Sequence, residues 1–191
     1  MKTNSLLLII DPQIDFINGS LPVNGAEEAM DNLAEYVSAH GNDYLHIVAT
    51  TDWHPYHHCS FKTEGGEWPI HCVQYSIGAA IHSELLKACN NVEARFTVLR
   101  KGDCISKEEY SIIQNGDSES ILDEIIRQSD ITDIHLCGLA GNICVLNTLK
   151  DLINIYGRDV ITVLPQYSPS LDDGSDLRHY LAENCIKTLS F

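Results

Sequence analysis

The chain has 191 residues, of which 44% are hydrophobic and 20% are charged, and its formal net charge is −15. This composition excludes a disordered chain, and the length suits one domain that spans residues 1–191. Because an acidic surface repels phosphate groups, we expect no binding to nucleic acid or to an anionic membrane.

Six short apolar runs, bounded by polar turns, are predicted to be strands. They lie at residues 6–10, 44–49, 96–99, 134–137, 160–164 and 185–189. Continuous apolar runs are typical of strands that are covered on both faces, as in a parallel sheet.

Helical spacing of apolar residues predicts four helices between these runs, at 26–39, 120–127, 143–156 and 175–183. The alternation of strands and helices predicts βαβ crossovers and an α/β fold with a parallel sheet. Residues 54–77 and 105–119 have no clear period. Long irregular loops inside compact domains are often functional, so these two segments are candidates for building a site.

The cysteines and the N-terminal segment bear on location. The seven cysteines are odd in number and include no CxxC pair, which does not fit the disulfide framework of a small secreted protein. Only six apolar residues precede Asp11, too few for a signal peptide or a membrane span. We therefore expect a cytosolic protein with reduced thiols, and homo-oligomer formation is left open.

Chemically useful side chains follow the first four predicted strands. They are, in chain order, Asp11, the pair Asp52 and His54, Lys101, and Cys144. Each has an ordinary alternative, such as a cap, a solvated cation or a small core residue. In open α/β sheets, however, ligands bind beyond the carboxyl ends of the strands, and these side chains would meet at that edge. The sequence therefore predicts an active site there.

Cys144 is the candidate nucleophile. It is predicted to lie in the first turn of a helix, with Gly141 or Asn142 as the cap. The N-terminus of a helix lowers the pKa of a thiol, and its free N–H groups can form an oxyanion hole. Cys137 lies inside a predicted strand and is expected to be a core residue.

Asp11 is the candidate general base beside this cysteine. Asp15 is its competitor, but it lies in a turn-like segment at 13–19 and is expected to be structural. Lys101 would stabilise the anionic forms of Asp11 and Cys144.

Asp52, His54 and His71 are the candidate metal ligands. Imidazole and carboxylate groups together suit zinc, iron or manganese. Three protein ligands leave positions open for water or substrate, which is typical of a catalytic site. His57 and His58 are nearby in sequence, and three roles stay open for them: ligands, neighbours of the ligands, or surface residues.

These residues lie in motifs that, in combination, resemble those of the isochorismatase-like cysteine hydrolases over essentially the whole chain. The motifs at 51–55, 58–61 and 68–74 resemble the nicotinamide-hydrolysing branch in particular. The motifs are Asp-Pro-Gln-Ile-Asp-Phe at 11–16, Gly-Ser-Leu-Pro-Val at 19–23, Thr-Asp-Trp-His-Pro at 51–55, His-Cys-Ser-Phe at 58–61, Trp-Pro-Ile-His-Cys-Val-Gln at 68–74, Lys-Gly at 101–102 and Gly-Leu-Ala-Gly-Asn-Ile-Cys-Val at 138–145.

The resemblance implies a fold and a set of site residues. The fold is a three-layer, Rossmann-like arrangement with a six-stranded, mainly parallel sheet between helices. The implied roles are a catalytic triad, three metal ligands, an oxyanion hole beside a cis peptide from Leu139 to Ala140, and an aromatic pocket. The residues are, in that order, Asp11, Lys101 and Cys144; Asp52, His54 and His71; the amides of Ala140 and Cys144; and Phe16, Trp68 and Tyr110.

The implied reaction is hydrolysis of the small molecule nicotinamide to nicotinate and ammonia, a step of NAD salvage. It would proceed through a cysteine thioester, with one divalent transition metal, zinc or else iron or manganese, orienting the substrate. Gly141 and Asn142 depart from the Thr-Asp that the family commonly has at these positions. Two alternatives stay open: a related cysteine amidase acting on a ureido or carbamoyl amide, and a non-enzymatic metal-binding α/β module.

Overall fold

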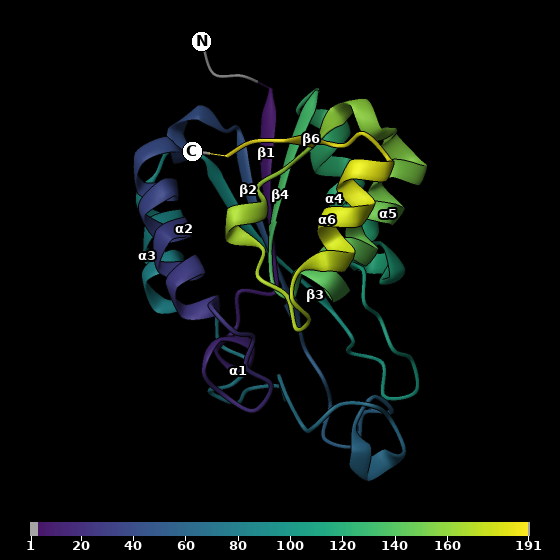
Figure 1. Ribbon diagram of the computed structural model, residues 1–191. Helices are drawn as coiled ribbons and strands as arrows, with labels where there is room; N and C mark the ends of the chain where they lie inside the picture. The colour runs from purple at the N-terminus through teal and green to yellow at the C-terminus, as the bar shows by residue number, and fades with distance from the viewer. Residues whose placement is uncertain (1–3, 191) are drawn as a thin grey trace.

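The computed structural model describes residues 4–190 and contains one six-stranded sheet in the order β3-β2-β1-β4-β5-β6 (Figure 1). Every neighbouring pair is parallel, which confirms the α/β class and makes the sheet parallel throughout. The strands are β1 (Ser5–Ile10), β2 (His46–Asp52), β3 (Arg95–Lys101), β4 (Asp133–Gly138), β5 (Ile161–Val163) and β6 (Lys187–Thr188).

Helices cover both faces of the sheet, as the resemblance implies (Figure 1). One face is covered by α2 (Ala26–His40) and α3 (Ser83–Asn91), and the other by α4 (Gly116–Gln128), α5 (Leu146–Tyr156) and α6 (Ser175–Glu183). A short α1 (Ile14–Ile17) follows β1. Single 3-10 turns lie at Gly41–Asp43, Lys62–Glu64, Ile112–Gln114, Arg158–Val160 and Pro165–Tyr167, and a π-helical turn at Gly141–Val145.

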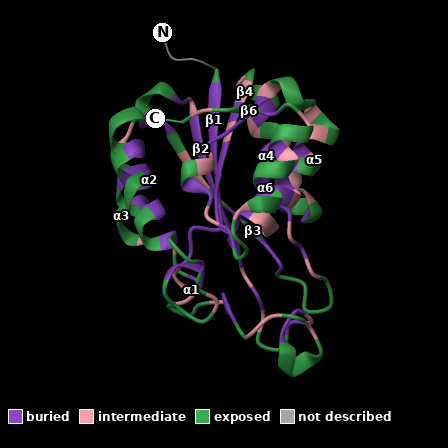
Figure 2. Cartoon of the chain, in the orientation of Figure 1, coloured by how far each residue is buried: buried purple, intermediate pink, exposed green. Residues whose placement is uncertain are grey.

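β1 shows why the apolar runs are continuous. All six of its residues are buried, and alternate side chains enter the two cores. Leu7 and Ile9 pack beneath α2 and α3, whereas Leu6 and Leu8 pack beneath the helices of the opposite face. Figure 2 shows the same layering, with buried strands inside and the outward sides of the helices exposed.

Two strands run further than predicted, and one helix was missed. β2 and β3 continue to Asp52 and Lys101, which pair with each other at the end of the ladder. These polar residues fall outside the apolar pattern, so the prediction stopped short of them. α3 was not predicted, because its buried face consists of only Leu85, Ala88 and Cys89. Within residues 4–190 no helix is both long and apolar enough to cross a membrane.

Candidate active site

Four predicted site residues meet where β1 to β4 end. Asp11 directly follows β1, Asp52 and Lys101 are the last residues of β2 and β3, and Cys144 lies in the turn after β4. All four are buried. Reactive atoms of Asp11, Asp52 and Cys144 lie within 4.8 Å of one another.

Lys101 connects the acidic groups to the thiol. Its Nζ lies 2.8 Å from Asp11 Oδ2 and 3.5 Å from Cys144 Sγ, and it also donates a hydrogen bond to Asp52 Oδ1. Burial alone would lower the pKa of Lys101, but the two carboxylates raise it well above its ordinary value. The lysine is therefore a fixed cation inside the site.

Asp11 is held in a strained backbone conformation, with φ of 45°, by contacts with β2. The Thr50 hydroxyl donates to Asp11 Oδ1 at 2.7 Å, and the Asp11 N–H donates to the Thr50 carbonyl oxygen at 3.1 Å. Burial raises the pKa of Asp11 above its ordinary value, Lys101 opposes the rise, and Asp52 adds to it. This carboxylate is accordingly a stronger base than an aspartate in water.

The thiol of Cys144 differs from the expectation in one respect. Burial raises its pKa well above the ordinary value, with Lys101 opposing and Asp11 adding to the rise. The expected lowering at a helix start was therefore wrong, because desolvation outweighs the helix end in this buried site. The resting group is a thiol, and a base is needed to ionise it.

The turn that carries Cys144 is also capped differently than predicted. Ala140 is the N-cap, with no side-chain cap, and Gly141–Val145 form the π-helical turn. Neither Gly141 nor Asn142 is therefore the cap. The Leu139–Ala140 peptide is cis, as the resemblance implies. Among the described residues, the Ala140 N–H has no hydrogen-bond acceptor, so it is free to bind a substrate oxygen.

Asp52, His54 and His71 form a compact buried group. Asp52 Oδ2 lies 3.6 Å from His54 Nε2 and 3.9 Å from His71 Nε2. His54 Nδ1 donates to the Gly102 carbonyl oxygen at 2.9 Å, and His71 Nδ1 donates to the Pro69 carbonyl oxygen at 2.8 Å. Because a carbonyl oxygen only accepts, these bonds place a proton on each Nδ1 and leave each Nε2 facing Asp52.

The donor set fits a metal ion. His54 Nε2 is buried and has no hydrogen-bond partner among the described residues, which leaves it available as a ligand. Although burial opposes the ionisation of Asp52, Lys101 and His54 hold the pKa of its carboxyl below the ordinary value. Burial lowers the pKa of His71, which favours the neutral imidazole that binds metals. Burial opposes a rise in the pKa of His54, but Asp52 raises it above the ordinary value, so a metal ion would take the place of a proton on its Nε2. Oxygen and imidazole donors of this kind suit a divalent transition metal.

The partners of the other two histidines bear on the roles left open for them, and His58 also lies within ligand distance of His54 and Glu108. His58 is buried and stacks on His54 with ring centroids 4.1 Å apart. Its Nδ1 contacts Ser60 Oγ at 2.7 Å and its Nε2 contacts the Lys107 carbonyl oxygen at 2.9 Å, and these contacts favour the role of a neighbour of the ligands. His57 is a surface residue that pairs with Glu64.

Asp15 has the structural role expected of it. Its Oδ2 accepts the Cys72 N–H at 2.7 Å, and its Oδ1 accepts the Ser20 N–H at 3.0 Å. These bonds fix the segment next to His71 against the start of α1.

A small cavity of about 20 Å³ joins the cysteine to the metal-binding group. It brings together the three predicted aromatic residues, Phe16, Trp68 and Tyr110. Trp68 Nε1 donates to the Tyr110 hydroxyl at 3.1 Å. Sequence reasoning missed four further lining residues, which are Leu21, Glu108, Ile143 and Leu171. Of these, Ile143 could have been found, because it directly precedes Cys144 in the sequence.

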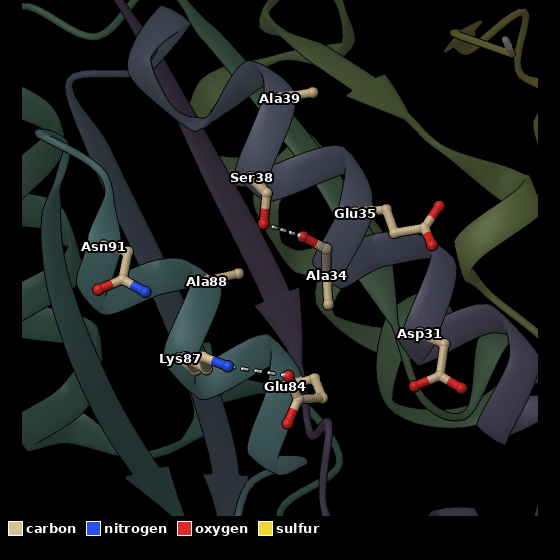
Figure 3. Close-up of a pocket in the computed structure, with 9 residues that line it drawn as sticks. All are labelled: Asp31, Ala34, Glu35, Ser38, Ala39, Glu84, Lys87, Ala88 and Asn91. Atoms are coloured by element: carbon tan, nitrogen blue, oxygen red, sulfur yellow. Dashed lines mark hydrogen bonds and ion pairs between the residues drawn. The ribbon is translucent and has the colours of Figure 1, made fainter.

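A larger cavity lies elsewhere. It measures about 770 Å³ and lies between α2 and α3 (Figure 3). Its walls combine alanines with charged side chains, among them the ion pair of Lys87 and Glu84 at 3.6 Å. None of the predicted site residues lines it. The smaller cavity is therefore the candidate active site.

The isochorismatase domain matches residues 5–164. The chain is 31% identical to the nicotinamidase of Escherichia coli (strain K12), over 82% of this chain and 80% of that protein. It is 32% identical to the nicotinamidase/pyrazinamidase of Mycobacterium tuberculosis, over 77% of each.

Solved structures agree. PnC1 from L. infantum in complex with nicotinate is 32% identical with a TM-score of 0.85, covering 100% of this chain and 94% of that one. The pyrazinamidase of Pyrococcus horikoshii in complex with zinc is 28% identical with a TM-score of 0.83, covering 98% and 99%. The extent of these matches shows that the chain belongs to the isochorismatase family.

Proposed function

We propose that this protein is a nicotinamidase, which hydrolyses nicotinamide to nicotinate and ammonia. The observation that carries the proposal is that the catalytic residues and the metal-binding residues are in direct contact through Asp52. Lys101 binds Asp52 on the side of the nucleophile, and the two histidines face the same carboxylate on the other side. A substrate in this cavity would meet a cysteine and a metal-binding group at once. The related nicotinamidases and the nicotinate-bound relative support the choice of substrate.

Asp52, His54 and His71 would hold one divalent metal, with zinc as the first candidate, as in the Pyrococcus horikoshii relative. When bound, the metal supplies a Lewis acid that can take the pyridine nitrogen as a ligand. The protein itself orients the ring, because Phe16, Trp68 and Tyr110 present aromatic surface in the same cavity.

Acyl transfer would begin with proton transfer from Cys144 Sγ to the Asp11 carboxylate. The sulfur then bonds to the carboxamide carbon, and the carbonyl electron pair moves to oxygen. The N–H groups of Ala140 and Cys144 would receive that oxyanion, and donors of this kind are worth about 3–4 kcal/mol. Lys101 stabilises the thiolate from 3.5 Å without giving up its own proton.

The same Asp11 would complete the reaction. It returns the proton to the leaving nitrogen, the C–N bond breaks, and ammonia departs from a Cys144 thioester. A water molecule then loses a proton to Asp11 and attacks the thioester carbon. The C–S bond breaks, Asp11 returns that proton to the sulfur, and the product leaves as nicotinic acid, which ionises to nicotinate. An aspartate whose pKa is raised by burial suits this double duty, because it both accepts and returns the proton.

The test is an ammonia-release assay on the purified protein with nicotinamide, a ureido amide and a carbamoyl amide, accompanied by metal analysis. Nicotinamide is expected to have the highest kcat/KM, and the protein to contain one divalent metal per chain. Preference for a ureido or carbamoyl amide would replace the proposed substrate. A metal-containing protein that releases ammonia from none of them would be a binding module.

A further inference from the structure

The segment 168–171, which lies between β5 and α6, crosses directly over the turn that carries Cys144. Two hydrogen bonds fix it there. The Gly141 N–H donates to the Pro169 carbonyl oxygen at 2.8 Å, and the Leu171 N–H donates to Asn142 Oδ1 at 2.9 Å. The segment 168–171 is thus attached to Gly141 and Asn142, the first two residues of the turn that carries Cys144.

Gly141 is the residue that permits this close approach. A Cβ at this position would lie 2.3 Å from the Ser168 carbonyl oxygen and 2.5 Å from Ser170 Oγ. The first of these contacts is with backbone, so no side-chain rotation relieves it. Any larger residue at 141 would therefore push the segment 168–171 away. Gly141 and Asn142 are also among the positions at which the sequence departs from the pattern that the resemblance implies.

Leu171 is the residue that this attachment delivers to the active site. Its side chain lines the cavity together with Cys144 and Ile143. Among the lining residues Leu171 is the exposed one, with a relative exposure of 37%, whereas the others are buried or intermediate. Leu171 is therefore the lining residue most open to solvent, which places it at the mouth of the cavity.

We propose that Leu171, positioned by Asn142 and Gly141, closes the mouth of the cavity and limits the substrate to a single unsubstituted ring. This inference rests on the proposed function for the identity of the substrate. The cavity is narrow, and a bulky ring substituent that points toward the mouth would need the space that Leu171 occupies. The exposed wall is the one whose removal opens the cavity without disturbing the core.

The first test compares kcat/KM for nicotinamide and quinoline-3-carboxamide, which keeps the ring nitrogen and the carboxamide but adds a fused ring. Leu171→Ala should reduce the preference for nicotinamide about tenfold or more, the range that one methylene-sized change in a pocket produces. Asn142→Ala should shift it in the same direction. Asn142→Asp should keep the wild-type preference, since a carboxylate oxygen accepts the same N–H. That rescue separates positioning of Leu171 from a general structural defect.

Leu86→Ala is the matched control, because Leu86 has the same 37% exposure but lies on α3. It should leave the preference unchanged. An unchanged preference in Leu171→Ala, in an enzyme that hydrolyses nicotinamide, overturns the inference and leaves the proposed function standing.

The second test does not depend on amide hydrolysis. Cys144 is alkylated with iodoacetamide or with a bulky N-aryl iodoacetamide, and the rates are measured by mass spectrometry of its peptide. The ratio of small to large reagent should fall in Leu171→Ala and in Asn142→Ala, while the ratio at the exposed Cys104 stays constant. Unchanged ratios at Cys144 contradict the proposed mouth, whatever the substrate is.

Discussion

The buried ammonium group of Lys101 lies 3.5 Å from the Cys144 sulfur. Lys101 is fully buried and Cys144 is 6% exposed, so their interaction is little screened by water. The carboxylates of Asp11 and Asp52 keep the lysine charged, and the lysine in turn prepares the site for a thiolate. Cys144 therefore rests as a thiol, and we expect it to become a thiolate when Asp11 accepts its proton.

Replacement of the nucleophile should abolish the reaction without unfolding the protein. We expect Cys144→Ala to release no ammonia from nicotinamide while its metal content and circular dichroism stay unchanged. Cys137→Ala is the control, because that buried thiol lies in β4 within the core beneath α2 and α3. An active Cys144→Ala protein beside an inactive Cys137→Ala protein would reverse the assignment.

Removal of the buried cation should cost stability as well as activity. Lys101→Met leaves the carboxylates of Asp11 and Asp52 facing each other without a counter-charge. Breaking a buried ion pair in this way costs about 3–5 kcal/mol of unfolding free energy. Urea denaturation of metal-free protein measures it, with Lys87→Met as the comparison, since Lys87 belongs to an exposed pair that contributes little. Equal stability of the two variants would show that Lys101 is not a charged partner.

The metal-binding group makes a separate prediction. Chelation should remove activity, and zinc, iron or manganese should restore it. His54→Ala and His71→Ala should both lower the metal content, whereas His57→Ala should not, because His57 pairs with Glu64 at the surface. Full activity in protein shown to be free of metal would refute this ligand set.

The acidic limb of the pH profile should report Asp11. Its carboxylate must be ionised to accept the thiol proton, so kcat/KM should fall as pH drops through the pKa of Asp11. Because burial raises that pKa, the midpoint should lie above the ordinary 3.8.

Thr50→Val removes a hydrogen bond that favours the ionised form of Asp11, and should move the acidic limb to higher pH. Thr51→Val is the control, because its hydroxyl donates to the Leu99 carbonyl oxygen at 3.3 Å. A limb that stays in place in Thr50→Val would assign it to another group.

The sequence carried enough information to find the chemical centre, because parallel strands bring their carboxyl ends to one edge. Asp11 and Cys144 are 133 residues apart in the chain, yet each follows a strand that the apolar pattern identifies. Their side chains meet because β1 and β4 are neighbouring parallel strands that end at the same edge of the sheet. His71 lies in the irregular segment 54–77, so no strand positions it, and its role as a ligand was predicted from its residue type together with Asp52 and His54.

The pattern failed where local sequence does not determine position. Leu171 and Glu108 reach the cavity from irregular segments, and neither has a periodic neighbour that indicates its direction. The pKa of Cys144 was predicted in the wrong direction because a helix start is visible in sequence, whereas the depth of burial is a property of the folded chain.

The most direct test of the account compares nicotinamide with benzamide in the metal-loaded enzyme. The two substrates differ by one ring atom, so their shape and their stacking on Trp68 are almost the same. If the group of Asp52, His54 and His71 holds a metal that binds the ring nitrogen, only that bond is lost. Sites that engage a polar atom reject analogues lacking it more strongly than apolar pockets reject a missing methylene, so kcat/KM should fall by more than about 100-fold. Equal kcat/KM for the two amides would contradict the account, because the metal-binding group would then play no part in recognising the substrate.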